Sequence, residues 1–175
     1  MTSPTRNPPE LASFVGTWTL DPDRTSIAFR TKALWMFPVK GTAKATEGSG
    51  TVNGDGSLSG TLVVDAASIS TGLKKRDAHL QTNDFFDVAT FPTLTFEATG
   101  GRPTGAGTFE LTGTLTVHGE SRPVTLSVDV GTTGTDVVTL ATEVEIDRSE
   151  WGLTLTPFGA GLKNRVVVSA TYRKS

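Results

Sequence analysis

The chain of 175 residues contains no cysteine. Because thiols are absent, a disulfide framework, a cysteine nucleophile and a cysteine-ligated zinc site are all excluded, and the redox compartment stays undetermined. The chain also has almost no excess of either charge, since its net charge is -2 and charged residues make up 19 % of it. Such a balanced surface creates no long-range field that would attract a polyanion, so we expect no nucleic-acid partner.

Long apolar runs are missing as well. No stretch of about 18 apolar residues is available to span a bilayer, and residues 1–13 lack the apolar segment of a secretion signal. These absences predict no stable membrane insertion and a cytoplasmic location for the chain as written. Residues 1–13 carry three prolines and few large apolar side chains, so we predict a flexible N-terminal tail followed by a single domain over residues 14–175.

Helical periodicity is nearly absent, and the sequence alternates instead. From residue 124 to 130, valine or leucine at each even position alternates with threonine, serine or aspartate at each odd one. A period of two also appears over 58–65, 111–117 and 138–146, which is typical of half-buried strands. The apolar face of such strands must be covered by a second sheet or by closure into a barrel.

The pattern predicts an all-β fold. Two segments, 105–118 and 136–148, are long enough for strongly coiled strands, and Gly60 and Gly113 lie within apolar faces where a barrel has to bend. We therefore predict an antiparallel barrel of about eight strands, a size that is either filled by side chains or holds one small ligand. The glycines at 48–50 and 53–56 are predicted to form hairpin turns. Strands are expected near residues 16–20, 25–33, 38–46, 49–54, 58–69, 92–100, 105–118, 121–131, 136–148 and 164–173.

Residues 72–83 interrupt the strand pattern. Their apolar and charged side chains recur at helical spacing after two hydroxyl residues, which predicts a short capped helix across one opening of the barrel. This helix either covers a ligand or only completes the core. The residues concerned are Leu73, Arg76, Asp77, Leu80 and Gln81, with Ser70 or Thr71 as the cap and Phe85 and Phe86 continuing the cover.

Several separated segments are similar to one family. The stretch 76–80, Arg-Asp-Ala-His-Leu, followed by 83–87 and 91–96, resembles the central signature of the YceI-like family. Segments 18–22, 26–29, 39–42, 113–119 and 146–153 resemble its other strands, so the likeness extends from Trp18 to Tyr172. The resemblance implies a lipocalin-like barrel with a helical insertion over its mouth. It also implies a carrier or storage protein that holds a polyisoprenoid or isoprenoid quinone, performs no catalysis, needs no cofactor and is compatible with a homodimer.

Apolar residues on the predicted loops, lid and inner strand faces are the candidates for contact with a hydrophobic small molecule. The continuous apolar run at 34–38 and the loop-like segment 156–162 suggest two sides of one mouth, because apolar loop residues need a partner. Each candidate could instead belong to the core, which leaves a stress-linked barrel with a filled core as one alternative. A barrel that binds a fatty acid or fatty amide is the other. The candidates are Phe29, Leu34, Trp35, Phe37, Leu73, Leu80, Phe86, Leu94, Phe96, Trp151 and Phe158.

Polar candidates are few. Lys74, Lys75 and Arg76 either receive a polar head group or form a solvated face. A second hypothesis is an ion-pair clamp between lid and barrel, joining Arg76 to Asp147, or Arg148 to Asp77 or Asp87. His79 and His118 lack partners at metal-ligand spacing, and the sequence has no Gly-x-Ser-x-Gly elbow, so neither a metal site nor catalysis is expected.

Overall fold

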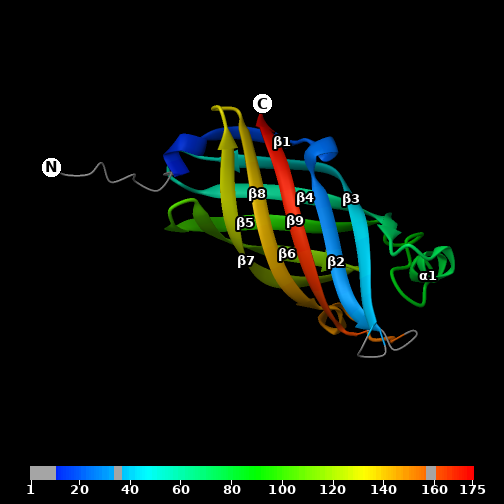
Figure 1. Cartoon of the computed structure of the whole chain (residues 1–175). Helices are drawn as coiled ribbons and strands as arrows, with labels where there is room; N and C mark the ends of the chain where they lie inside the picture. Colours follow the sequence, from blue (N-terminus) through cyan, green and yellow to red (C-terminus); the bar gives the residue numbers. More distant parts are fainter. Residues whose placement is uncertain (1–10, 34–36, 157–160) are drawn as a thin grey trace.

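The alternating segments form nine strands in the computed structural model, which describes residues 11–33, 37–156 and 161–175. One short α-helix, α1, lies between β4 and β5 at one end of the molecule (Figure 1). The elements are η1 (Leu11–Phe14), β1 (Gly16–Leu20), η2 (Pro22–Arg24), β2 (Ser26–Ala33), β3 (Phe37–Val52), β4 (Leu58–Ser70), α1 (Lys74–Leu80), β5 (Thr93–Gly105), β6 (Thr108–Val117), β7 (Glu120–Thr133), β8 (Val137–Asp147), η3 (Arg148–Trp151) and β9 (Lys163–Lys174).

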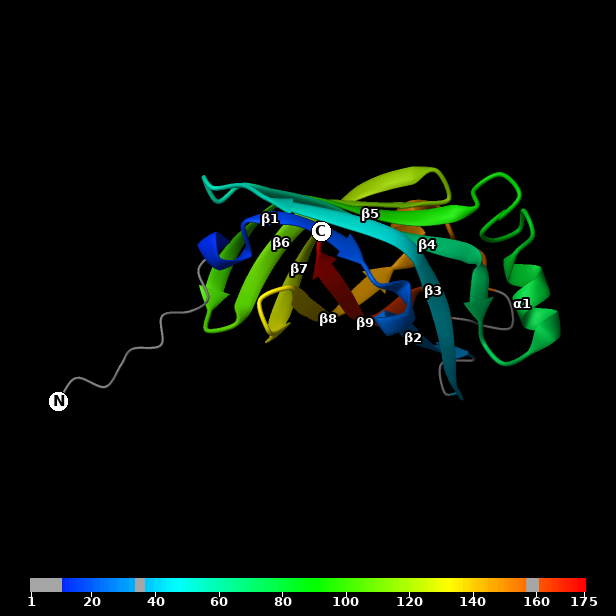
Figure 2. The same cartoon turned by 90° about the horizontal axis from the view of Figure 1, so that it is seen from above.

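The sheet closes on itself. Its strands follow the order β2-β9-β8-β7-β6-β5-β4-β3, and β3 pairs with β2 again to complete the ring (Figures 1 and 2). β1 shares the position of β2, because it pairs with the far end of β3 and with the last residues of β9, while β2 pairs with earlier residues of both. The ring therefore has eight positions, which confirms the predicted antiparallel barrel.

The two strands predicted at 38–46 and 49–54 form one continuous strand, β3. Gly48 and Gly50 lie inside it and not in a turn, so that part of the sequence prediction was wrong. A side chain at Gly48 would lie 2.7 Å from the carbonyl oxygen of Thr61. Glycine here allows close approach between neighbouring backbones. The turn at 53–57 does form, and the Gly56 amide donates to the Asn53 carbonyl.

η1 crosses the predicted boundary between tail and domain. η1 begins at Leu11, so regular structure starts before residue 14, the predicted first residue of the domain. The indole Nε1 of Trp18 donates to the carbonyl oxygen of Phe14 at 2.9 Å, which ties the end of this turn to β1. Residues 1–10 of the predicted tail lie outside the described residues.

α1 is shorter than predicted and is capped differently. Its N-cap residue is Leu73, whose side chain makes no capping hydrogen bond. Thr71 instead donates its backbone amide, at 2.8 Å, and its hydroxyl to the carboxylate of Asp77 in the first turn. The hydroxyl residues thus hold the strand-to-helix connection to the helix and do not cap it. Within the described residues, no helix is long and apolar enough to cross a bilayer.

The barrel interior is apolar but loosely filled. Two clusters of buried side chains occupy it, one around Trp18, Leu20 and Tyr172 beneath β1, and one around Phe85 and Trp151 beneath α1. Protein interiors are normally close-packed, whereas residues of both clusters border unfilled space inside this barrel.

Candidate ligand-binding site

A cavity of about 310 Å³ lies inside the barrel at the end covered by α1. We call it the helix-end cavity. Its wall is almost entirely apolar and is built from inward-facing positions of β2 to β9, because every second residue of a barrel strand points inside. Phe85 and Phe86 close it beneath the helix, with their rings in edge contact at 4.9 Å between centroids.

Six of the eleven residues predicted to contact an apolar ligand line this cavity: Phe29, Leu80, Phe86, Leu94, Phe96 and Trp151. Trp151 is fixed by its indole Nε1, which donates to the carbonyl oxygen of Leu115 at 2.8 Å.

Two other predicted contact residues lie outside the cavity wall. Phe37 is 59 % exposed and Leu73 is 57 % exposed. Phe37 begins β3 at the rim of the barrel, and Leu73 precedes the first turn of α1, so neither position faces the interior. The remaining three, Leu34, Trp35 and Phe158, lie outside the described residues.

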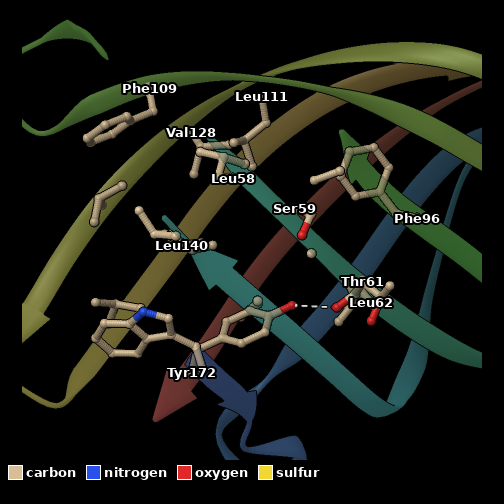
Figure 3. Close-up of a pocket in the computed structure, with 18 of the residues that line it drawn as sticks. Leu58, Ser59, Thr61, Leu62, Phe96, Phe109, Leu111, Val128, Leu140 and Tyr172 are labelled. Carbon is tan, nitrogen blue, oxygen red and sulfur yellow. Dashed lines mark hydrogen bonds between the residues drawn. The ribbon is translucent and has the colours of Figure 1, made fainter. Parts of the chain in front are cut away.

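A second cavity, of about 180 Å³, occupies the other end of the barrel beneath β1, and we call it the far-end cavity. Figure 3 shows residues of its wall, among them Phe109, Leu111, Val128, Leu140 and Tyr172. An apolar cavity of about 150 Å³ is large enough to hold benzene and stays dry. The far-end cavity therefore offers room for part of an apolar ligand.

Polar groups are concentrated in the wall of the helix-end cavity next to α1. Arg76 lines it, and its guanidinium donates to the hydroxyl of Thr71 at 2.7 Å and to the carbonyl oxygen of the same residue at 2.9 Å. His79 also lines it, 38 % exposed at the side chain and 3.3 Å from the carboxylate of Asp84. This end of the cavity therefore lies close to solvent. Lys74 and Lys75, the other predicted head-group residues, are exposed and do not line it.

Arg148 is the most deeply placed charge in the wall. It is 8 % exposed, and its guanidinium donates to the carbonyl oxygens of Leu153, of Leu155 at 2.7 Å and of Gly161 at 3.1 Å. The guanidinium carbon also lies 5.1 Å from the centre of the Phe85 ring. Burial lowers the pKa of Arg148 from its usual value, while Asp147 opposes that shift. Arg148 thus joins Leu153, Leu155 and Gly161 to the end of β8.

The predicted ion-pair clamps do not form among the described residues. Arg76 bonds to Thr71, while the Asp77 carboxylate accepts from Thr71 and Ser70. The Asp147 carboxylate accepts the hydroxyl of Ser149 and, at 3.0 Å, its amide, and these two bonds lower the pKa of Asp147. Arg76, Asp77, Asp147 and Arg148 all bond to nearby hydroxyl or backbone groups, which reach them at a lower entropic cost than a distant side chain would. Nor does any cluster of metal-ligating side chains occur in the described part of the chain.

Comparison with known proteins agrees with this geometry. The model of the YceI-like domain matches residues 18–173. The chain belongs to the YceI-like family. It is 43 % identical over 61 residues to a UPF0312 protein of Azotobacter vinelandii, and this stretch covers 35 % of the chain and 32 % of that relative. The match thus spans about a third of the relative's length.

Solved structures show the same fold at lower sequence identity. BcnA of Burkholderia cenocepacia aligns with a TM-score of 0.75 at 21 % identity, covering 87 % of this chain and 98 % of that one. A polyisoprenoid-binding domain from Saccharophagus degradans, implicated in plant cell wall breakdown, aligns with a TM-score of 0.74 at 17 % identity, covering 90 % and 98 %.

Sequence reasoning missed much of the cavity wall of this YceI-like barrel. Val124, Leu126, Val144 and Val166 line the helix-end cavity, although none of them was among the candidates predicted from the sequence. Their signal was the alternation itself, since each lies on the apolar face of its strand. Arg148 was recognised as charged, but nothing in the sequence shows that its partners are backbone carbonyls.

Tyr172 provides a test of how dry the far-end cavity is. Its hydroxyl donates to the carbonyl oxygen of Thr61 at 2.9 Å (Figure 3), and burial raises the pKa of Tyr172 from 10.0 to about 12. Because the folded state holds this proton more tightly than the unfolded state, the resulting stability is fully present below pH 10 and is lost as the pH rises towards about 12.

We expect Tyr172→Phe to lower the free energy of unfolding by about 1 kcal/mol at neutral pH and to remove this part of the alkaline loss. Tyr172 is the only tyrosine in the chain, so phenolate absorbance reports on it alone. A folded-state midpoint close to 10 would show that water reaches the hydroxyl.

Proposed function

We propose that this protein binds a long apolar ligand, a polyisoprenoid or isoprenoid quinone, inside its barrel and carries or stores it without chemical change. The helix-end cavity carries the proposal, because about 310 Å³ of apolar space remains where side chains could have filled the barrel. Small-molecule sites typically measure about 300–1,000 Å³. The polyisoprenoid-binding domain from Saccharophagus degradans has the same fold and supports this choice of ligand class.

The energetics suit reversible binding. Burying about ten methylene groups contributes roughly 8 kcal/mol, at ~0.8 kcal/mol for each group. The loss of translational and rotational freedom on association offsets a large part of that gain. A ligand held in this way exchanges with other acceptors without a covalent step, as a carrier or storage protein requires.

The distribution of polar groups gives the bound ligand a direction. Where the helix-end cavity borders the far-end cavity, Leu62, Leu126 and Val168 line its wall without a polar side-chain atom, so that part suits a hydrocarbon tail. On α1, Arg76 and His79 line the wall and can donate hydrogen bonds to an oxygen-bearing head group. The two guanidinium groups of Arg76 and Arg148 also favour a carboxylate, which keeps a fatty acid as the second candidate.

The test is to purify the protein from its own host, extract it with organic solvent and analyse the extract by mass spectrometry. An isoprenoid present at a stoichiometric ratio is the expected result, and a fatty acid would support the second candidate. If the protein is repeatedly empty and takes up neither ubiquinone nor geranylgeraniol in titrations, the proposed function is contradicted.

A further inference from the structure

The two cavities meet at a ring of side chains that belongs to both walls. Every other lining residue contacts one cavity only, so this ring marks the boundary between them. We call it the collar. Its members are Leu62, Phe96, Leu126, Thr142 and Val168.

The barrel topology places the collar residues across from one another. Leu62 on β4 pairs directly with Phe96 on β5, and Thr142 on β8 pairs directly with Val168 on β9. In the closed ring, β4 and β5 stand opposite β8 and β9. The two pairs therefore project towards the barrel axis from opposite walls, and Leu126 on β7 lies beside the second pair.

Phe96 has the largest side chain in the collar, and its ring packs against the neighbouring strand β6. A Cβ atom built on Gly113 of the neighbouring strand would lie 2.8 Å from the ring's Cζ atom, so the ring covers that glycine. Figure 3 shows Phe96 among the residues that line the far-end cavity. Thr142 donates its hydroxyl to the carbonyl oxygen of Ser127 at 2.7 Å, which satisfies the polar atom of this collar residue.

We propose that the collar sets the length of the apolar chain that the protein accepts, with Phe96 as the residue that determines this specificity. This inference rests on the proposed function. A chain that enters beside α1 fills the helix-end cavity and meets the collar, and a longer chain has to displace the Phe96 ring to reach the far-end cavity. Affinity therefore rises with chain length only until the helix-end cavity is full.

The test compares the affinities of wild type and Phe96→Ala for geraniol, farnesol, geranylgeraniol and geranylfarnesol. Removing the ring joins the two cavities, so the variant should bind the longest alcohol about tenfold more tightly than wild type, since more apolar surface is buried. The shortest alcohol should differ by less than about threefold between the two proteins, because it does not reach the collar. Phe96→Leu, a milder change, should give an intermediate gain.

Phe109→Ala is the matched control, because it removes the same atoms from the far-end cavity and leaves the collar intact. It should leave the length dependence of wild type unchanged. Equal length dependence in wild type, Phe96→Ala and Phe96→Leu would overturn the proposal, as would an equal gain in Phe109→Ala. Thermal melts establish that each variant is folded.

Straight-chain alkanols separate this inference from the proposed function. If alkanols show a length limit that Phe96→Ala removes, while no isoprenoid alcohol binds, the collar is upheld and the isoprenoid ligand is rejected. If neither series binds to any of the proteins, no apolar chain enters the barrel, and both proposals fail.

Discussion

Val166→Trp is expected to weaken the binding of geranylgeraniol about a hundredfold. Val166 on β9 lines the helix-end cavity and pairs directly with Phe29 on β2 and Val144 on β8. An indole at this position would occupy space that the ligand needs. Displacing three or four methylene groups costs about 3 kcal/mol, which corresponds to about a hundredfold in the dissociation constant.

The neighbouring residue supplies the control for this experiment. Val167 lies on the outer face of the same strand and is 44 % exposed, so Val167→Trp adds the same side chain outside the barrel. Binding by Val167→Trp should equal that of wild type in fluorescence or calorimetric titrations. If both variants bind as wild type does, the ligand does not occupy the helix-end cavity. Thermal melts should show that Val166→Trp remains folded, because the indole enters existing empty space.

Arg148→Met is expected to lower the free energy of unfolding by about 3 to 5 kcal/mol. The carbonyl oxygens of Leu153, Leu155 and Gly161 all accept hydrogen bonds from this guanidinium. Methionine fills a similar volume but offers no donor, so the buried carbonyl of Leu153 and the partly buried carbonyls of Leu155 and Gly161 all lose a partner. Two of these partners, Leu153 and Gly161, line the helix-end cavity. Urea denaturation measures the loss.

Arg165→Met is the matched control for the arginine substitution. Arg165 forms an ion pair with Glu143 on the barrel exterior, and both side chains are about half exposed. Exposed pairs of this kind contribute at most about 1 kcal/mol. Arg148→Lys should recover less than half of the loss, because one ammonium group cannot reproduce the planar fork of donors. Equal destabilisation by Arg148→Met and Arg165→Met would show that the carbonyl contacts contribute little.

The strands could be predicted because their signal is local. Residues 124–130 alternate between apolar and polar side chains, and β7 places the even-numbered members inside and the odd-numbered members outside. The helix was also visible, since its spacing differs from that of every strand. The division at Gly48 was predicted wrongly because glycine marks turns and close backbone contacts alike. Only the pairing of β3 with β4 distinguishes the two uses.

The candidate site was less predictable than the fold. Phe37 was predicted to contact the ligand, yet it is exposed. Val124 and Val144, which were not predicted to do so, line the cavity. A valine on an inner face has the same sequence signature whether it touches another side chain or borders empty space. The Arg148 contacts were hidden for a related reason, because backbone carbonyls carry no residue-specific signal.

By itself, the sequence determined the strand alternation, the single helical insertion and the membership of a family with a known fold. These depend on side-chain order along one segment at a time. The tertiary structure alone decided that the barrel interior is divided into two cavities, that β1 and β2 share one position, and that Arg148 bonds to the carbonyls of Leu153, Leu155 and Gly161. The cavities depend on how the volumes of opposing side chains add up across the barrel. The shared position and the Arg148 bonds depend on backbone groups, which carry no residue-specific signal.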